Sequence, residues 1–345
     1  MSLVVAGYNS SYQLATESNG RDNEDDPCVI EPKVIDIETS NLLFISLGCD
    51  HTLFLYSDGT VYGVGAKQFF LEKGEGNSKI PILIPIPNNE PVKWVYAGMK
   101  FSAFLTVNGN VYLHTGKLLM KNIVYLSGAA SKPYMIDKDG VIHKLKKIHT
   151  PDVVLHFQLP MPAYDVCGGK KSALAISTQG KLYGYYTMNP RGRKDFELIC
   201  ELSSYNFKRV FGRAELIGAL REDGVGYIAN VPKVKKLKVH PSDGQKIESM
   251  EFGYCTCFIT YEGGDIHCFG NNGSAQLMLG RKSERENIQP LNFSDSIRHI
   301  FTGNCHTIVA LCELKYLHPG MAYFEVGKSE NSAKSVEKLL KFLNE

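Results

Sequence analysis

The residues best suited to chemistry in this sequence are its cysteines and histidines, and their spacing is not that of a metal site. Nine cysteines are scattered along the 345 residues, and the only close pair is Cys255 and Cys257. A zinc site needs a second such pair, or a pair of histidines at similar spacing, and the sequence has neither. We therefore expect no metal, no cofactor and cysteines that act as small buried hydrophobic residues.

The signatures of nucleotide chemistry and covalent catalysis are also missing from the sequence. There is no phosphate-binding loop of the form G-x-x-x-x-G-K-[ST], and the glycines recur as turn formers. No nucleophile can be paired with a base from its spacing. We expect His51 and His306 to be structural residues that bond the backbone near the start of a strand. Bond-making catalysis is therefore not predicted.

Clusters of basic residues are better candidates for a functional surface. The predicted partner-binding residues are Lys144, Lys146 and Lys147, then Arg191, Arg193 and Lys194, then Lys233 and Lys235. Pro190 precedes the second cluster and Gly192 lies within it, which is typical of an exposed loop. The chain holds 38 Lys and Arg against 36 Asp and Glu, so these clusters predict a polarised protein rather than a strongly charged one. The alternative is that these lysines only solvate outer strands.

A repeated glycine pattern indicates the elements that hold these clusters. A glycine ends a short apolar run about every 30 to 50 residues. These glycines are Gly48, Gly98, Gly128, Gly168, Gly212, Gly253 and Gly303. After each of the first six, a turn pair such as Asp58-Gly59, Asn108-Gly109 or Asp139-Gly140 follows about a dozen residues later, which is typical of tight hairpins. Each unit therefore predicts a strand, a strand, a tight turn and a third strand, followed by a variable segment that can supply a fourth.

Seven such units predict an all-β fold, a seven-bladed β-propeller over residues 1–327. A single small sheet cannot bury both faces, whereas sheets stacked in a ring can. The N-terminal run Val4–Leu14 matches the second half of the sixth unit, Cys268–Leu277, and has no first half. We expect it to complete the seventh blade and close the ring. Residues 328–345 are expected to form a short amphipathic C-terminal helix or tail, docked on the rim or serving a partner.

The repeat resembles that of the regulator of chromosome condensation family. The resemblance rests on Gly48-Cys49-Asp50-His51-Thr52, on Gly303-Asn304-Cys305-His306-Thr307, and on the Gln-Leu pairs at Gln13 and Gln276. It covers about residues 1–327 and marks the chain as a divergent member. A propeller of the WD type is the rival, but no Trp-Asp dipeptide exists and Trp94 is the single tryptophan.

The resemblance implies a regulator, by guanine nucleotide exchange, of a small GTPase of the Ran or Rho type. The alternatives are a scaffold propeller without exchange activity, and a binder of chromatin or another anionic surface through its basic rim. Nucleic acid is the less favoured partner. The sequence has no apolar run of the roughly 18 residues that a membrane-spanning helix needs. We expect a monomer in the cytoplasm, or alternatively in the nucleus.

Overall fold

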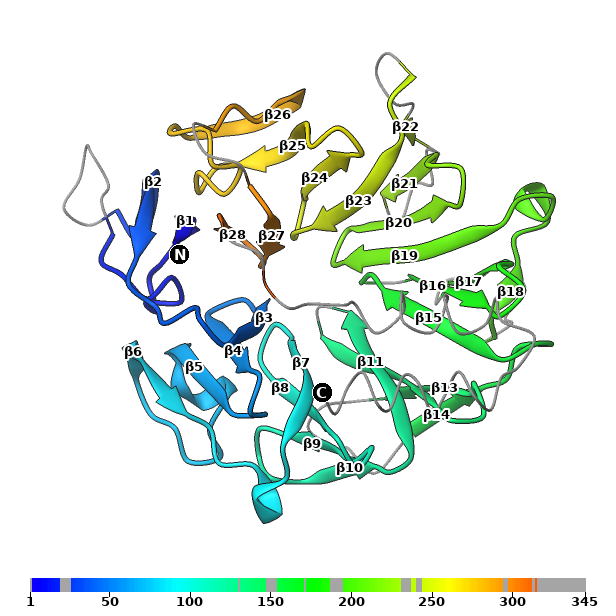
Figure 1. The fold of residues 1–345 in the computed structure, drawn as a ribbon, viewed down its shortest axis with the longest axis horizontal. Helices are drawn as coiled ribbons and strands as arrows, with labels where there is room; N and C mark the ends of the chain where they lie inside the picture. Colours follow the sequence, from blue (N-terminus) through cyan, green and yellow to red (C-terminus); the bar gives the residue numbers. More distant parts are fainter. Residues whose placement is uncertain are drawn as a thin grey trace.

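The protein is a ring of seven four-stranded antiparallel sheets, blades 1 to 7, in a computed structural model (Figure 1). The structure describes residues 2–18, 26–129, 131–146, 154–170, 172–186, 195–230, 237–239, 244–293, 297–311 and 314. The predicted all-β, seven-bladed propeller is therefore confirmed.

Blades 1 to 6 are each built from four consecutive strands. Blade 1 contains β3 (Leu42–Leu47), β4 (His51–Tyr56), β5 (Val61–Ala66) and β6 (Asn77–Leu83). Blade 2 contains β7 (Val92–Ala97), β8 (Ser102–Thr106), β9 (Val111–Leu113) and β10 (Leu118–Met120). Blade 3 contains β11 (Ile123–Ala129), β12 (Lys132–Asp137), β13 (Ile142–Leu145) and β14 (Val154–Phe157). Blade 4 contains β15 (Ala163–Gly168), β16 (Ser172–Ser177), β17 (Leu182–Tyr186) and β18 (Glu197–Leu198). Blade 5 contains β19 (Phe207–Arg213), β20 (Leu216–Arg221), β21 (Gly226–Asn230) and β22 (Leu237–Val239). Blade 6 contains β23 (Ile247–Phe252), β24 (Thr256–Tyr261), β25 (Ile266–Asn272) and β26 (Ser283–Pro290). Three short 3₁₀ helices, η1 (Lys67–Phe69), η2 (Pro87–Asn89) and η3 (Cys200–Leu202), lie in the connections.

Blade 7 joins the two ends of the described chain. It contains β27 (His299–Thr302) and β28 (His306–Ala310), followed in the sheet by β1 (Leu3–Tyr8) and β2 (Cys28–Ile35). The register pairs Leu3 with Ala310 and Gly7 with His306. Figure 1 shows the blue N-terminal strands beside the orange C-terminal ones. The predicted closure of the ring by the N-terminal strand is therefore confirmed.

The core is a set of seven apolar layers, one at each junction between neighbouring blades. The second strands β8 and β16 are buried along their whole length, because blades cover both of their faces. The outer strand β26 contains only exposed and partly buried residues, as expected for an edge that faces solvent. The apolar runs of the repeat therefore fill the spaces between blades.

Glycine serves two different purposes in the repeat. The hairpin glycines Gly59, Gly109 and Gly140 have φ angles of 81°, 78° and 77°, which confirms the predicted tight turns. The glycines that end the first strands are needed for space instead. A Cβ on Gly48 would lie 2.4 Å from Cε1 of His51, three residues further along the chain. Gly48 and the imidazole ring of His51 therefore form one packing unit.

The N-terminal segment repeats the back half of blade 6 in detail, as the sequence predicted. Gly7 and Gly270 have φ angles of 117° and 112°, and Tyr12 and Ala275 have φ angles of 63° and 61°. The Oδ1 atom of Asn9 accepts the amide of Leu14 at 2.9 Å, and the matching bond in blade 6 has the same length. The same loop structure therefore occurs in blades 6 and 7.

The end of the chain falls largely outside the description. The predicted C-terminal helix within residues 328–345 lies among the residues that the structure does not describe. Among the described residues, no helix is both long enough and apolar enough to cross a membrane.

Candidate functional site on the turn face

One face of the ring carries the turns between the first and second strands of every blade, and we call it the turn face. Because the strands of each blade alternate in direction, the connections from third to fourth strands open on the same side. Four main-chain hydrogen bonds link five of these turns to one another. These are Lys170 N to Ala214 O, Glu215 N to Tyr254 O, Tyr254 N to Asn304 O, and Asn304 N to Gly48 O. The inner part of the turn face is therefore a bonded rim that runs from blade 4 to blade 1.

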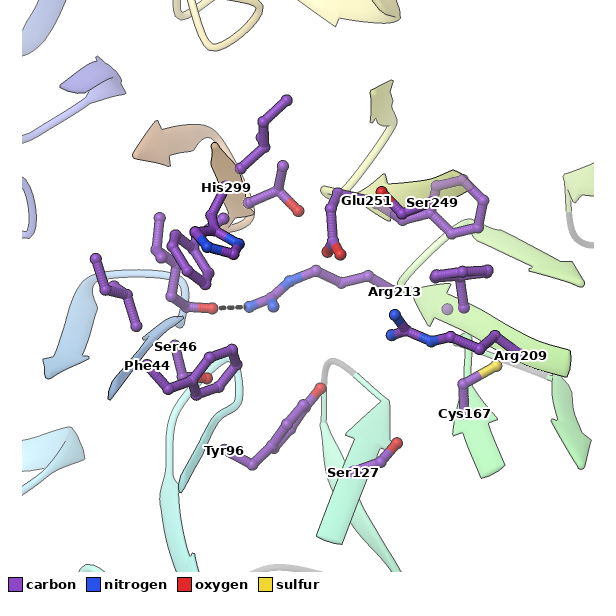
Figure 2. A pocket seen from close by; sticks show the side chains of 18 of the residues that line it. Phe44, Ser46, Tyr96, Ser127, Cys167, Arg209, Arg213, Ser249, Glu251 and His299 are labelled. Atoms are coloured by element: carbon purple, nitrogen blue, oxygen red, sulfur yellow. Dashed lines mark hydrogen bonds between the residues drawn. The ribbon is translucent and has the colours of Figure 1, made fainter. Parts of the chain in front are cut away.

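Arg213 crosses the ring at this rim. Its side chain is only 7% exposed, and its guanidinium donates to the carbonyl of Leu47 and, at 3.3 Å each, to those of Gly48 and Ala97 (Figure 2). These carbonyls end the first strands of blades 1 and 2, whereas Arg213 belongs to blade 5. Burial lowers the pKa of the guanidinium from its ordinary value. Arg213 therefore ties three blades together with a single cation.

His51 and His306 lie under the rim and are fully buried. Burial lowers the pKa of each imidazole to about 3, so both are neutral. Nε2 of His51 lies 2.9 Å from the Ser102 hydroxyl, which itself donates to the carbonyl of Phe69 at 2.8 Å. Because that hydroxyl has one hydrogen, the His51 Nε2–H is the donor of the first bond. The predicted structural role fits this burial, although the partner of His51 is a hydroxyl group rather than the backbone.

Two threonine hydroxyl groups also form hydrogen bonds between blades. The Thr52 hydroxyl donates to the Gln13 carbonyl at 2.8 Å, and the Thr307 hydroxyl donates to the Gln276 carbonyl at 2.7 Å. The Gln-Leu pairs noted in the sequence therefore lie at two blade junctions, from 7 to 1 and from 6 to 7. Their role in the fold is to join blades.

The predicted basic residues have different outcomes. Lys146 is exposed at the end of β13. Lys144 is 7% exposed, and its ammonium lies 4.5 Å from the Tyr185 ring and 5.1 Å from the Tyr134 ring. Burial lowers the pKa of Lys144 to about 8. Lys144 is buried because β13 lies between β12 and β14, and its role in partner binding stays a prediction. Lys147, Arg191, Arg193, Lys194, Lys233 and Lys235 lie outside the described residues.

Charged residues on the innermost strands were missed by the sequence analysis. Asp165 is fully buried and accepts the Tyr125 hydroxyl at 2.7 Å and the Val210 amide at 2.9 Å. Burial raises the pKa of this carboxyl, and the positive charge of Arg209 opposes that rise. The sequence did hold a signal for Asp165, which is the only charged residue within the run Ala163–Gly168. Asp165 therefore joins blades 3, 4 and 5.

The described residues gather no set of ligands for a metal. Within the ranges given above, no group of three or more His, Cys, Asp or Glu side chains is placed to hold an ion. The turn face is thus built from main-chain bonds, buried polar ties and exposed side chains. Such a surface is suited to recognition.

These features define a seven-bladed propeller whose blades are tied at their inner turns, and solved structures share this fold. No known family profile and no curated protein matches the sequence. Human WBSCR16 is similar over 91% of this chain and 100% of its own, with a TM-score of 0.75 and 13% identity. Prp20p from Saccharomyces cerevisiae is similar over 89% of this chain and 90% of its own, with a TM-score of 0.73 and 14% identity. Yeast RCC1 (Prp20) bound to Kap60 has a TM-score of 0.71 and 14% identity. The predicted resemblance is confirmed at the level of the fold.

Proposed function

We propose that this protein is a binding propeller that engages an acidic surface of a protein partner through its turn face. The observation that carries this proposal is the ring that it shares with Prp20p, a protein described with its binding to Gsp1p and histones. The finer form of the proposal is that the partner is a small GTPase of the Ran or Rho type, and that binding releases its guanine nucleotide.

Nucleotide exchange of this kind requires a rigid binding surface and no covalent catalysis by the exchange factor. A factor that binds the nucleotide-free GTPase more tightly than the loaded form shifts the equilibrium by that difference in affinity. The bonded rim from blade 4 to blade 1 and the Arg213 crossing support such a fixed surface.

The described charges favour the turn face over the opposite face. Lys100, Lys146 and Lys170 are exposed on the turn face, where Lys170 pairs with Glu215 at 3.0 Å. Exposed acids at the hairpin tips of the opposite face include Asp58, Asp139, Asp223 and Asp265. The proposal also includes the basic segments that follow the third strands in the sequence and lie outside the described residues, with Lys147, Arg191, Arg193, Lys194, Lys233 and Lys235. Opposite charges on the partner would speed its encounter with this face.

The test is nucleotide release from a panel of small GTPases loaded with a fluorescent guanine nucleotide. We expect one member to release nucleotide faster with the wild-type protein. The double variant Lys100→Glu, Lys146→Glu should slow that effect, and Lys138→Glu, an exposed lysine on the opposite face, should not. Equal loss in both variants would place the contact elsewhere, and no release with any member would remove the exchange proposal.

Two further outcomes separate the alternatives. Stable binding of a GTPase without nucleotide release would indicate a scaffold. Binding to DNA with a steep fall in affinity as salt rises would indicate a binder of anionic surfaces, because counterion release makes such binding salt-dependent.

A further inference from the structure

The axis of the propeller contains a cavity of about 430 Å³. The first strands of all seven blades line it, from the turn-face end at Leu47 and Gly212 to Glu248 and His299 at the other end. This volume falls within the roughly 300 to 1,000 Å³ typical of sites for small molecules. Arg213 crosses the cavity at the turn face, so a ligand would enter from the opposite face.

Arg209 supplies a cation in the cavity wall that no carboxylate holds by a hydrogen bond. It is 8% exposed, and its Nε has no hydrogen-bond partner. Its guanidinium carbon lies 4.8 Å from the Phe211 ring centre, and it forms no ion pair with any residue that the structure describes. The nearby Asp165 carboxylate is already occupied by Tyr125 and Val210. The charge of Arg209 acts on Asp165 and Glu251, but neither carboxyl accepts a hydrogen bond from its guanidinium, so its N–H groups remain available to an anion.

The wall opposite Arg209 is aromatic. Phe44 stacks on Trp94 with ring centres 4.2 Å apart, and it meets Phe301 edge to face at 5.5 Å. All three rings line the cavity. This side suits a flat, apolar body, whereas the Arg209 side suits an anionic group.

Glu251 is the group that competes with a bound anion. In Figure 2 the Arg213 side chain runs between the Glu251 carboxyl group and the Arg209 guanidinium, and all three groups lie in the wall of the cavity. Removal from bulk water raises the pKa of Glu251 to about 7, and the two arginines oppose that rise. A neutral Glu251 leaves the positive charge of Arg209 in place, so the cavity then favours an anion.

We propose that the axial cavity binds a small carboxylate or phosphate compound with an aromatic or apolar body, its anionic group on Arg209 and its body against Phe44 and Trp94. Arg209 is suited to this task because a guanidinium fork binds either anion through two parallel hydrogen bonds. Arg213 is not the anchor, because the carbonyls of Leu47, Gly48 and Ala97 already occupy its guanidinium.

Trp94, the single tryptophan, makes occupancy of the cavity directly measurable. The full-length protein is titrated with benzoate, with its neutral analogue benzamide and with inorganic phosphate, and the Trp94 fluorescence is followed. We expect a saturable change with benzoate and one at least about tenfold weaker with benzamide, since a charge-assisted bond is lost. The response to phosphate shows whether an anion alone is enough for binding or whether the aromatic ring of benzoate is needed as well.

Two variants make the test specific. Arg209→Gln should weaken benzoate binding at least about tenfold, and Glu251→Gln should strengthen it, because a competing carboxylate is removed. Arg281→Gln, which changes an exposed arginine on the turn face, is the control and should bind as the wild type does. If Arg209→Gln does not fold, Glu251→Gln decides alone. Equal responses to benzoate and benzamide, an unchanged response in Arg209→Gln, or no gain in Glu251→Gln would each overturn the proposal.

Discussion

The guanidinium of Arg213 donates to the main-chain carbonyl of Leu47, a residue 166 positions away in the sequence and on the other side of the ring. The bond spans from blade 5 to blade 1, and the same cation also reaches Gly48 and Ala97. The Gly48 carbonyl also accepts the Asn304 amide of blade 7, so Arg213 reinforces the main-chain rim at this point. A single side chain therefore spans the ring at the turn face.

The first prediction concerns this cation. Arg213→Met should lower the free energy of unfolding by about 2 to 3 kcal/mol, since bonds from a charged donor are lost and three buried carbonyls are left without it. Urea-induced unfolding measures the change. Arg281→Met, which removes an exposed arginine, should stay within about 0.5 kcal/mol of the wild type. Similar values for the two variants would show that the crossing carries no stability.

The second prediction treats Gly48 and His51 as one packing unit. Gly48→Ala should destabilise the protein because its new Cβ would lie 2.4 Å from Cε1 of His51. His51→Ala removes that ring, so the alanine at position 48 should cost less in the double variant. The expected coupling lies between about 0.5 and 3 kcal/mol. A double-mutant cycle of urea unfolding measures it, and strict additivity would contradict the packing explanation.

The third prediction separates backbone strain from steric conflict at the hairpin tips. Gly264 has φ of 88° and open space around it, whereas Gly140 has φ of 77° and a Cβ there would lie 2.4 Å from Cβ of Pro162. Gly264→Ala should therefore cost about 1 kcal/mol, the usual penalty of a positive φ. Gly140→Ala should cost clearly more. Thermal unfolding of the two variants side by side tests this order, and the reverse order would count against it.

The fourth prediction concerns acid stability. Glu90 accepts hydrogen bonds from Asn110 at 2.9 Å and from Thr106 at 2.7 Å. Hydrogen bonds, of which these two have the largest effect, lower the pKa of Glu90 to about 2. The ordinary value is 4.5, so this stability is fully present above pH 4.5 and is lost as the pH falls toward 2.

Glu90→Gln should therefore flatten the fall in stability across that pH window. Urea unfolding of the variant and the wild type at several pH values between 2 and 6 measures the difference. Glu262→Gln changes an exposed carboxyl and serves as the control. If both variants keep the slope of the wild type, the Glu90 bonds do not contribute to acid stability.

The fifth prediction concerns the closing blade. Removal of residues 1–18 would leave β28 without β1 and the apolar layer between blades 7 and 1 without Leu3, Val5 and Leu14. We expect loss of a single cooperative unfolding transition. Hydrogen exchange should also show β1 in the intact protein to be as protected as the central strand β8. Rapid exchange in β1 would mean that the ring does not depend on this strand.

Most of the fold could be predicted because its signals are local. Gly59 and Gly140 follow turn-forming aspartates, and each hairpin needs only neighbouring residues to form. The closure could be predicted because the run Val4–Leu14 is half a unit without its other half. The burial of Lys144 could not be predicted because it depends on Tyr185 in the next blade. Arg209, Arg213 and Glu251 escaped notice because first strands from different blades converge on one axis only after the ring closes.

The pairing of β1 with β28 sets an order of events during synthesis. At about 5 to 20 residues per second, a ribosome takes on the order of 15 to 60 seconds to pass from the first strand to residue 310. Throughout that time β1 can pair with β2 but not with β28. Blade 7 is thus started long before it can be finished, and the ring closes only after β28 has been made.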